Sequence, residues 1–361
     1  MRHGPRLAIA IETTLGWRTV RQNWIHFYPG DLDLLPIWID IDLPATGMGS
    51  FKYARGKLLH AMQRIQMSGI VNRQLRKANP DVALIGNMAL NLVLGRSGMP
   101  MFTMLDATQI QLQSFGSKYG IYPSKVKRLE SFKHSMRCRT YDRCVGIFSF
   151  SNWAKKSLVT HYGIDPAKIH VIPQGVAIDR WEYGAQSDKS DKVCNILFVG
   201  GDFWRKGGGV LLDWAARTKD RNWHLHIVTQ DHIDLEDNRI TVYHGIQPGD
   251  GKLSELFTMA HLFALPTFAD CSPSAVMEAL ASGLPVITSQ VGGVPEMIIE
   301  GTTGFAIPAA KMEMLDSVLS LLINDPALRI RMGAAAREDA EARFDAKKNI
   351  KATLDLIAAA V

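Results

Sequence analysis

Residues 268–295 read FADCSPSAVMEALASGLPVITSQVGGVP, and this stretch decides the fold of the chain. An apolar run at 261–266 precedes it and predicts a buried strand. Ser272 is a typical helix N-cap residue and Pro273 favours the first helical position, so a helix is expected to follow. Residues 286–288 then predict the next strand. A strand, a helix and a strand in this order are typical of a parallel α/β sheet.

Two carboxylates accompany the start of this helix. Asp270 stands in the loop before it, and Glu278 lies about 7.5 Å along the helix axis. The backbone amides of Ser274 and Ala275 suit an anion, whereas Pro273 has no N–H to offer. We therefore expect a ligand with a central diphosphate and hydroxyl groups at both ends.

A glycine-rich segment supplies cations for the same ligand. Residues 200–209 follow an apolar strand at 194–199 and contain Gly201, Arg205 and Lys206. Glycines let backbone amides approach a phosphate, and the neighbouring cations complement its charge. Because the segment lies between a predicted strand and a predicted helix, we expect it to bind the phosphates.

These residues resemble a known family. Asp270 and Glu278 have the Glu-x7-Glu spacing of the family 4 retaining glycosyltransferases, and the following ALASGLPVITS and GGVPE are similar to the usual sequence of that family. The resemblance implies an α/β GT-B fold, with two Rossmann-like domains facing each other across a crevice and a last helix that crosses back to the first domain. Two positions differ: Asp270 replaces the usual Glu, and Gly201 stands where many members have Arg.

The resemblance also implies roles for the residues. The donor site would comprise Gly201, Arg205, Lys206, Asp270, Ser274, Ala275 and Glu278. Glu278 suits the ribose, since a carboxylate accepts two hydroxyl hydrogen bonds, and Asp270 suits the sugar and is a candidate catalytic residue. The structural alternative is that Asp270 caps the helix and that Glu278 is a solvated residue on it.

The first half of the chain offers acceptor-side residues. Residues 7–11 and 101–105 predict strands, and loops that follow strands in an open α/β sheet face the ligand. Glu12 and Gly16 follow the first of these strands and are candidate acceptor-binding residues; alternatively, Gly16 only makes the turn. Asp106 follows the other strand, near the position where the family often has a His, and is a candidate catalytic residue; alternatively, it caps the next helix.

The length of the chain predicts two domains, because 361 residues exceed one typical domain. We expect an acceptor-binding domain at 1–175, joined by the returning helix at 345–361, and a nucleotide-sugar-binding domain at 176–344. Within the second domain, residues 303–305 are expected to make a turn. The four cysteines have no metal-ligand or redox spacing.

Charge is distributed unevenly. Residues 1–150 hold 20 Lys and Arg against 9 Asp and Glu, whereas the remainder holds 21 against 26. This basic half suggests an anionic partner such as a membrane surface or a lipid-linked acceptor. Two segments, 52–77 and 118–143, carry much of the charge; the simpler alternative is that both are helices with a solvated basic face. No motif indicates nucleic acid.

The chain is expected to be cytoplasmic, either free or at the inner face of the membrane. No apolar run reaches the roughly 18 residues of a membrane-spanning helix, and the N-terminus lacks a signal-peptide pattern. An apolar content of 47% and a charged content of 21% are typical of a globular protein.

These observations predict a metal-independent glycosyltransferase without a cofactor, and the family resemblance implies that it retains the configuration of the sugar. It would move a hexose-type sugar from a UDP- or GDP-sugar to a glycan, lipid-linked or small-molecule acceptor. Two alternatives stay open, a GT-B sugar-nucleotide epimerase and a catalytically weak nucleotide-sugar-binding protein. The second alternative draws on Gly201, Asp106 and Asp270, where the sequence departs from the family.

Overall fold

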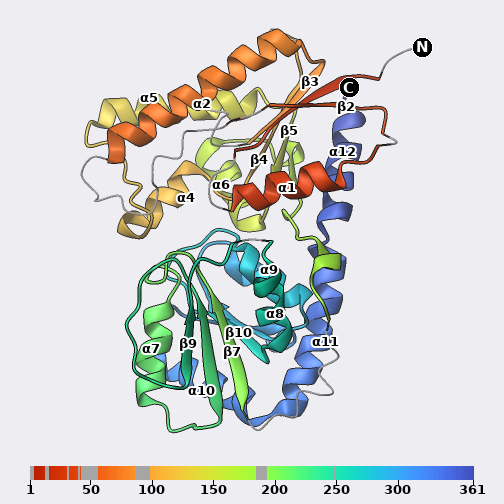
Figure 1. Ribbon diagram of the computed structural model, residues 1–361. Helices are drawn as coiled ribbons and strands as arrows, with labels where there is room; N and C mark the ends of the chain where they lie inside the picture. The colour runs from red at the N-terminus through yellow and green to blue at the C-terminus, as the bar shows by residue number, and fades with distance from the viewer. Residues whose placement is uncertain are drawn as a thin grey trace. The chain divides into compact units, whose positions relative to one another are not determined.

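The computed structural model describes residues 4–12, 16–30, 32–39, 41, 56–86, 98–183, 193–247 and 249–361. The chain divides into two compact units. The first comprises Met1–Gln174 together with Lys347–Val361, and the second comprises Gly175–Ala346. Each unit contains one six-stranded parallel sheet with helices packed on it (Figure 1). The predicted α/β class is therefore confirmed.

The sheet of the first unit has the strand order β2-β1-β3-β4-β5-β6, and every neighbouring pair is parallel. Its strands are β1 (Arg6–Ala10), β2 (Leu35–Trp38), β3 (Val82–Gly86), β4 (Met101–Leu105), β5 (Gly146–Ser149) and β6 (Ile169–Val171). The residues of β3, β4 and β5 are all buried, as expected for central strands that are covered on both faces.

Helices cover this sheet. They are α1 (Trp17–Phe27), α2 (Gly56–Ala78), α4 (Gln109–Ser114), α5 (Lys127–Asp142) and α6 (Asn152–Tyr162), with 3-10 turns at Gly116–Lys118 and Pro166–Lys168. The sequence sets the ends of α6 plainly. The Ser151 hydroxyl caps the first turn by accepting a hydrogen bond from the Ala154 amide, and Gly163 ends the helix with φ +67°. The residues predicted to be helical at 87–94 lie outside the described parts.

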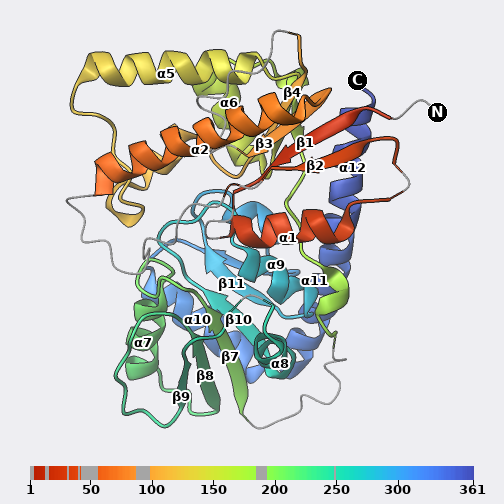
Figure 2. The ribbon, with the colours of Figure 1, turned by 45° about the horizontal axis from the view of Figure 1, so that its top comes forward.

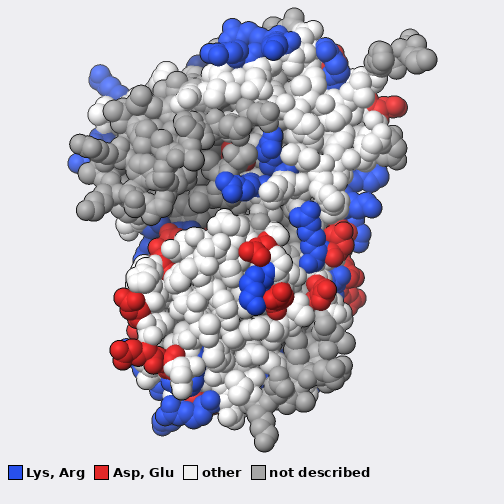
Figure 3. Space-filling model, viewed as in Figure 1, with Lys and Arg blue, Asp and Glu red and all other residues white. Residues whose placement is uncertain are grey.

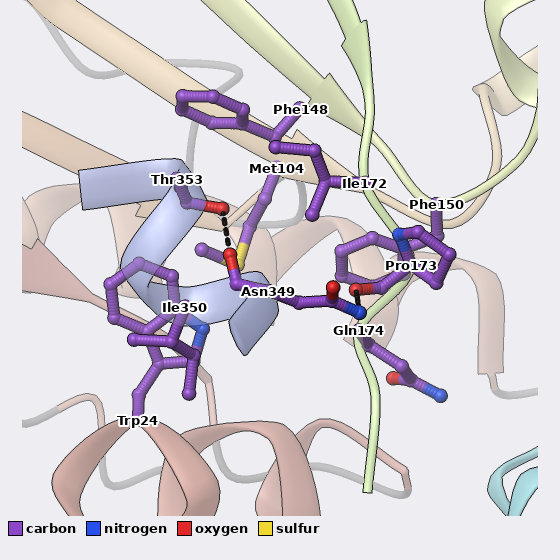
Figure 4. Close-up of a pocket in the computed structure, with 10 residues that line it drawn as sticks. All are labelled: Trp24, Met104, Phe148, Phe150, Ile172, Pro173, Gln174, Asn349, Ile350 and Thr353. Carbon is purple, nitrogen blue, oxygen red and sulfur yellow. Dashed lines mark hydrogen bonds between the residues drawn. The ribbon is translucent and has the colours of Figure 1, made fainter. Parts of the chain in front are cut away.

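The last helix, α12 (Ala346–Ala358), returns to the first unit. Ile350 of α12 and Trp24 of α1 lie together in the wall of a small pocket (Figure 4). The Asn349 side-chain amide donates a hydrogen bond of 3.1 Å to the Pro173 carbonyl, which belongs to the segment after β6. Apolar packing and this hydrogen bond thus confirm the expected return of the final helix.

The sheet of the second unit has the order β12-β11-β10-β7-β8-β9 and is also parallel throughout. Its strands are β7 (Cys194–Val199), β8 (Trp223–Val228), β9 (Ile240–Tyr243), β10 (Leu262–Leu265), β11 (Val286–Ser289) and β12 (Gly304–Ile307). The turn expected at 303–305 lies two residues earlier, at 301–303, and Gly304 already pairs with Val286 as the first residue of β12. A Cβ on Gly304 would lie 2.0 Å from the Val286 carbonyl oxygen, so glycine serves close strand contact there.

In the described part of the second unit, five helices accompany the sheet. They are α7 (Gly208–Arg217), α8 (Gly251–Met259), α9 (Ser274–Ala281), α10 (Met312–Asn324) and α11 (Pro326–Arg343), with 3-10 turns at Ile178–Arg180 and Val294–Met297. Helix α9 is the most enclosed of them, since every residue from Val276 to Ala281 is buried. Arg337 of α11 donates to the Ala281 carbonyl at 2.5 Å, which satisfies an acceptor at the C-terminal end of α9. The stretch at 268–295, which decides the fold, therefore contributes its helix to the core of this unit.

Candidate active site

Helix α9 begins later than the sequence suggested. Pro273 is the N-cap residue, with φ −69° and ψ 120°, and Ser272 does not cap the helix. An extended ψ at Pro273 keeps it outside the helix, so Ser274 is the first helical residue. The missing N–H of proline therefore costs the helix start nothing, and the amides of Ser274 and Ala275 remain in its first turn.

The glycine-rich loop between β7 and α7 packs directly against the end of β10. Gly207 has φ +88°, and a Cβ there would lie 2.0 Å from the Pro266 carbonyl oxygen. Only glycine meets both demands. The Arg205 carbonyl also accepts a hydrogen bond of 2.9 Å from the Phe268 amide. The two loops singled out in the sequence thus form one joined surface.

Arg205 is fixed in this surface by three groups. Its Nη1 donates to the Ala269 carbonyl at 2.7 Å, and its Nε donates to Asp202 Oδ2 at 2.9 Å. The same Nη1 lies 3.9 Å from Asp270 Oδ2. The guanidinium is therefore oriented before any ligand binds, and it stands beside the loop that precedes α9.

Asp270 is held by both candidate phosphate-binding cations. Its Oδ2 forms a short ion pair with Lys206 Nζ, and its Oδ1 accepts a hydrogen bond of 3.1 Å from the Cys271 amide. The Asp270 residue is only 5% exposed. The alternative that Asp270 caps α9 is wrong, since Pro273 occupies that position. The structure thus brings Arg205, Lys206 and Asp270 together.

Glu278 lies on the buried face of α9 and is 7% exposed, so it is not the solvated helix residue of the structural alternative. Within the described parts of the chain, its carboxylate has no hydrogen-bond or ion-pair partner. Burial raises the pKa of Glu278 to about 7, because the charged form loses its hydration. A buried carboxylate of this kind is well suited to accept hydrogen bonds from ligand hydroxyl groups.

Gly201 has room for a side chain. A Cβ built on it would meet nothing nearer than Gln230 Cγ, at 3.8 Å. The Arg that many members of the resembled family carry at this position would therefore start without a steric conflict. Gly201 offers the site only its backbone.

Two acidic side chains support the glycine-rich loop, and sequence patterns did not identify either. Asp202 accepts a hydrogen bond from the Arg205 side chain, and Asp231 Oδ2 accepts one of 2.7 Å from the Phe203 amide. Asp231 follows β8, one strand away from the loop in the sheet. A contact across 28 residues leaves no local signal in the sequence.

The acceptor-side candidates lie in the first unit. Glu12 follows β1 and Asp106 follows β4, and these strands flank β3 in the parallel sheet, so both residues lie at the same edge. Glu12 is fully buried. A Cβ on Gly86, the last residue of β3, would lie 2.2 Å from Glu12 Oε2. Gly86 therefore provides the space into which the Glu12 carboxylate extends.

Asp106 differs from its structural alternative, whereas Gly16 lies in a turn, as its alternative expected, beside residues 13–15 that are outside the described parts. Thr108, not Asp106, is the N-cap residue of α4, and its hydroxyl accepts a hydrogen bond of 3.4 Å from the Gln111 amide. Gly16 has an ordinary φ of −61° at the start of α1, and a Cβ there would meet nothing within 4 Å. Neither backbone conformation nor crowding requires glycine at this position.

Among the described residues, no group of three or more His, Cys, Asp or Glu side chains could hold a metal ion. None of the helices that these residues form combines the length and apolarity needed to cross a membrane.

Comparison with known proteins identifies the family. The model described as "Glycosyl transferases group 1" matches residues 179–339, and the model described as "Glycosyltransferase Family 4" matches residues 54–180. A D-inositol 3-phosphate glycosyltransferase of Corynebacterium glutamicum is 30% identical over 212 residues, which cover 51% of this chain and 50% of that protein. An MMP alpha-(1->4)-mannosyltransferase of Mycolicibacterium hassiacum is 24% identical over 206 residues, 54% of this chain and 49% of that one. The chain spans about half the length of the curated relatives it matches.

Solved structures support the same assignment of fold. Sucrose-phosphate synthase from Thermosynechococcus elongatus superposes with a TM-score of 0.74 at 15% identity, covering 98% of both chains. Anabaena HepE in complex with UDP gives a TM-score of 0.72 at 15% identity, covering 98% of this chain and all of that one. With two family models that together span residues 54–339 and a GT-B architecture shared along almost its whole length, the chain belongs to the family 4 glycosyltransferases.

Proposed function

We propose that the chain transfers a hexose-type sugar from a UDP- or GDP-sugar to a glycan, lipid-linked or small-molecule acceptor, with retention of configuration. One observation carries the proposal: Arg205, Lys206 and Asp270 converge beside the first turn of α9, and the buried Glu278 lies further along the same helix. This set offers cations and amides for a diphosphate and carboxylates for hydroxyl groups.

Arg205 and Lys206 stabilise the leaving diphosphate. As the bond between the sugar and the phosphate breaks, negative charge grows on the diphosphate. Arg205 is already oriented by Asp202 and Ala269, so little reorganisation is needed when that charge develops. The amides at the start of α9 add the positive end of a helix dipole. These groups perform the task without a metal ion or a further cofactor.

The carboxylates orient the two ends of the donor. Glu278 accepts hydrogen bonds from the ribose hydroxyls, and the buried site strengthens them because water does not compete. Asp270 contacts the transferred sugar while it holds Lys206 near the phosphates. Glu12, Gly16 and Asp106 serve the acceptor, with Asp106 near the reacting carbon. The displacement takes place on one face of the sugar, with the leaving phosphate as the base.

Similar proteins favour a UDP-sugar as the donor. Anabaena HepE has been solved in complex with UDP and with UDP-glucose. The relatives from Corynebacterium and Mycolicibacterium are named for transfer to an inositol phosphate and for mannosyl transfer, respectively. The basic first half of this chain agrees with an acceptor that carries negative charge, and we place the reaction at the inner face of a membrane.

A panel of nucleotides and their sugars tests the proposal. Thermal unfolding is followed with UDP, GDP, ADP and the corresponding sugars, and the preferred nucleotide raises the unfolding midpoint. The Lys206→Ala variant should lose most of this shift, whereas Lys219→Ala, which changes an exposed lysine after α7, should retain it. Product analysis with the preferred donor then separates transfer to an acceptor from epimerisation of the donor. Tight donor binding with neither product nor hydrolysis would instead identify a binding protein.

A further inference from the structure

The N-terminal half of α5 and the loop before it expose apolar side chains. Tyr122, Val126, Leu129 and Phe132 are 42%, 60%, 44% and 63% exposed, respectively. Large apolar side chains are usually covered, so four within 11 positions of one surface segment form an unusual patch. Figure 2 shows α5 as a straight helix along the edge of the first unit, where α6 packs against its inner side.

Cations surround this patch. The exposed basic residues between positions 120 and 140 are Lys125, Lys127, Arg128, Lys133 and Arg139. Residues 118–143 hold eight Lys and Arg against two Asp and Glu. Arg128, Phe132 and Arg139 follow at spacings of four and seven, so they share one side of the helix. We call the four apolar and five basic residues the α5 face.

The acidic residue within this segment is turned away from the α5 face. Glu130 Oε1 accepts a hydrogen bond of 2.9 Å from the Gln113 side chain, and its Oε2 accepts one of 2.8 Å from the Ser124 amide. These bonds fix the loop before α5 to the segment after β4. The other acid, Asp142, lies at the C-terminal end of the helix, 3.7 Å from Lys168. The α5 face itself is therefore purely basic and apolar.

The inner side of α5 is firmly anchored. The ring of Tyr141 packs edge-on against the ring of Tyr162 in α6, with ring centroids 5.3 Å apart. The centroid of the His134 ring lies 5.1 Å from that of Tyr162. Tyr141 is 3% exposed. The helix can therefore present its outer residues without unfolding from the unit.

Helix α2, the other basic segment, lacks such a patch in its described part. Its exposed residues there include Arg73, Arg76 and Lys77, whereas its apolar residues Val71 and Leu75 are buried. That pattern is typical of a helix with a solvated basic face. On the side of the molecule drawn in Figure 3, Lys and Arg also outnumber acidic side chains over the first unit. Among the side chains that the structure describes on these two helices, both helices expose basic residues, and the large exposed apolar residues belong to α5.

We propose that the α5 face docks on a lipid bilayer that contains anionic lipids. The cations would lie at the level of the headgroups, and Phe132, Leu129 and Val126 would enter the boundary with the acyl chains. A nucleic acid would engage the charges but would gain nothing from aliphatic side chains. The inference deepens the proposed function, since a lipid-linked acceptor would be presented at such a surface, but the docking can be measured without transfer.

Flotation with vesicles tests this inference. The full chain is mixed with vesicles of phosphatidylcholine alone and with vesicles that also contain phosphatidylglycerol. Wild type should bind the second kind, and Arg128→Glu/Arg139→Glu should weaken binding at least about tenfold. Arg76→Glu/Lys77→Glu on α2 makes the same change in net charge and should bind much more tightly than the α5 double variant. Phe132→Ser should weaken binding most at high salt, where the electrostatic attraction is screened.

Three results would overturn the inference: no binding of wild type to anionic vesicles at low salt, equal weakening by both double variants, or no effect of Phe132→Ser at any salt concentration. Single-stranded RNA is titrated in parallel, and RNA binding that depends on the two arginines while Phe132→Ser leaves vesicle binding intact also counts against a bilayer. Each variant is checked for the nucleotide-induced thermal shift. A wild type that floats but shows no such shift would reject the donor site and leave the docking surface standing.

Discussion

Lys206 and Asp270, which are 64 residues apart in the sequence, form a partly buried ion pair that joins the glycine-rich loop to the loop before α9. The cation that we propose for the donor diphosphate is thus already paired with a carboxylate. A bound diphosphate would compete with Asp270 for the same ammonium group, because both carry negative charge. In the proposed site, Asp270 would therefore weaken donor binding while it keeps Lys206 in place.

Replacing Asp270 by Asn should separate catalysis from donor binding. The amide keeps the size of the side chain but removes the charge that positions Lys206, so the transfer rate should fall by about 100-fold or more. Affinity for the nucleotide should stay the same or increase, because the diphosphate no longer meets a competing carboxylate. Single-turnover rates and nucleotide titrations measure the two effects. An unchanged rate would remove Asp270 from the mechanism.

Asp270→Glu is the matched control for this experiment. It restores the residue that the family usually has and preserves the charge, while lengthening the side chain by one methylene, or about 1.5 Å. Transfer should persist in this variant, with a change in the preferred sugar as the main effect. A loss as large as that of Asp270→Asn would show that the close fit between Asp270 and Lys206, rather than charge, is what matters.

Donor binding should depend on pH through Glu278. Its pKa of about 7 in the free protein means that the carboxylate must form before it can accept two ribose hydrogen bonds. Affinity for the nucleotide should therefore rise about tenfold between pH 6 and pH 8. Calorimetry in buffers of different ionisation enthalpy should detect a proton released on binding. Glu278→Gln should bind more weakly and lose the pH dependence; a variant that retains it would exclude Glu278 as the source.

The free energy of unfolding should also depend on pH through Glu278. Because the folded-state pKa of Glu278 is raised from 4.5 to about 7, its contribution to the free energy of unfolding is fully present below pH 4.5 and is lost as pH rises through 7. Glu278→Gln should therefore gain stability relative to wild type as pH increases, by up to about 3 kcal/mol between these limits. Denaturant unfolding of both ligand-free proteins at several pH values measures the difference. Parallel curves for the two proteins would contradict the prediction.

The sequence predicted the elements whose signals are local. The strands expected at 101–105 and 194–199 have those bounds in the structure, because continuous apolar runs between polar residues mark buried strands. Gly304 was misassigned, since a four-residue edge strand that opens with glycine has the composition of a turn. Glu278 could not be placed as buried or solvated from its type alone.

Contacts between segments that are distant in the sequence could not be predicted, because the signals in a sequence are local. No local pattern indicates that Lys206 contacts Asp270 or that Gly86 faces Glu12. Both relationships arise because parallel strands bring loops from separate parts of the chain to one edge of a sheet. The family resemblance implied roles for Lys206 and Asp270, whereas their contacts could be identified only from the structure.

Adding an arginine at Gly201 should strengthen donor binding. The space around this position is open, with Gln230 Cγ as the nearest atom to a new Cβ, and Gly201 lies in the glycine-rich loop that follows β7. Gly201→Arg should lower the dissociation constant for the nucleoside diphosphate several-fold, because an added guanidinium can bind phosphate oxygens in a bidentate manner. Gly201→Gln is the uncharged control. Equal affinities for wild type and Gly201→Arg would show that the position lies out of reach of the phosphates.

Gly86 and Gly69 offer a matched pair of substitutions in the first unit. A methyl group on Gly86 would overlap Glu12 Oε2, whereas one on Gly69, an exposed residue of α2 with no role in the proposed site, would meet nothing within 4 Å. Gly86→Ala should therefore displace the Glu12 carboxylate and raise the KM for the acceptor about tenfold, with little change in nucleotide affinity. Gly69→Ala should leave both constants close to those of wild type. Steady-state kinetics with each substrate varied in turn, together with thermal unfolding to verify folding, distinguishes the two; a Gly86→Ala enzyme with an unaltered acceptor KM would exclude Glu12 from acceptor binding.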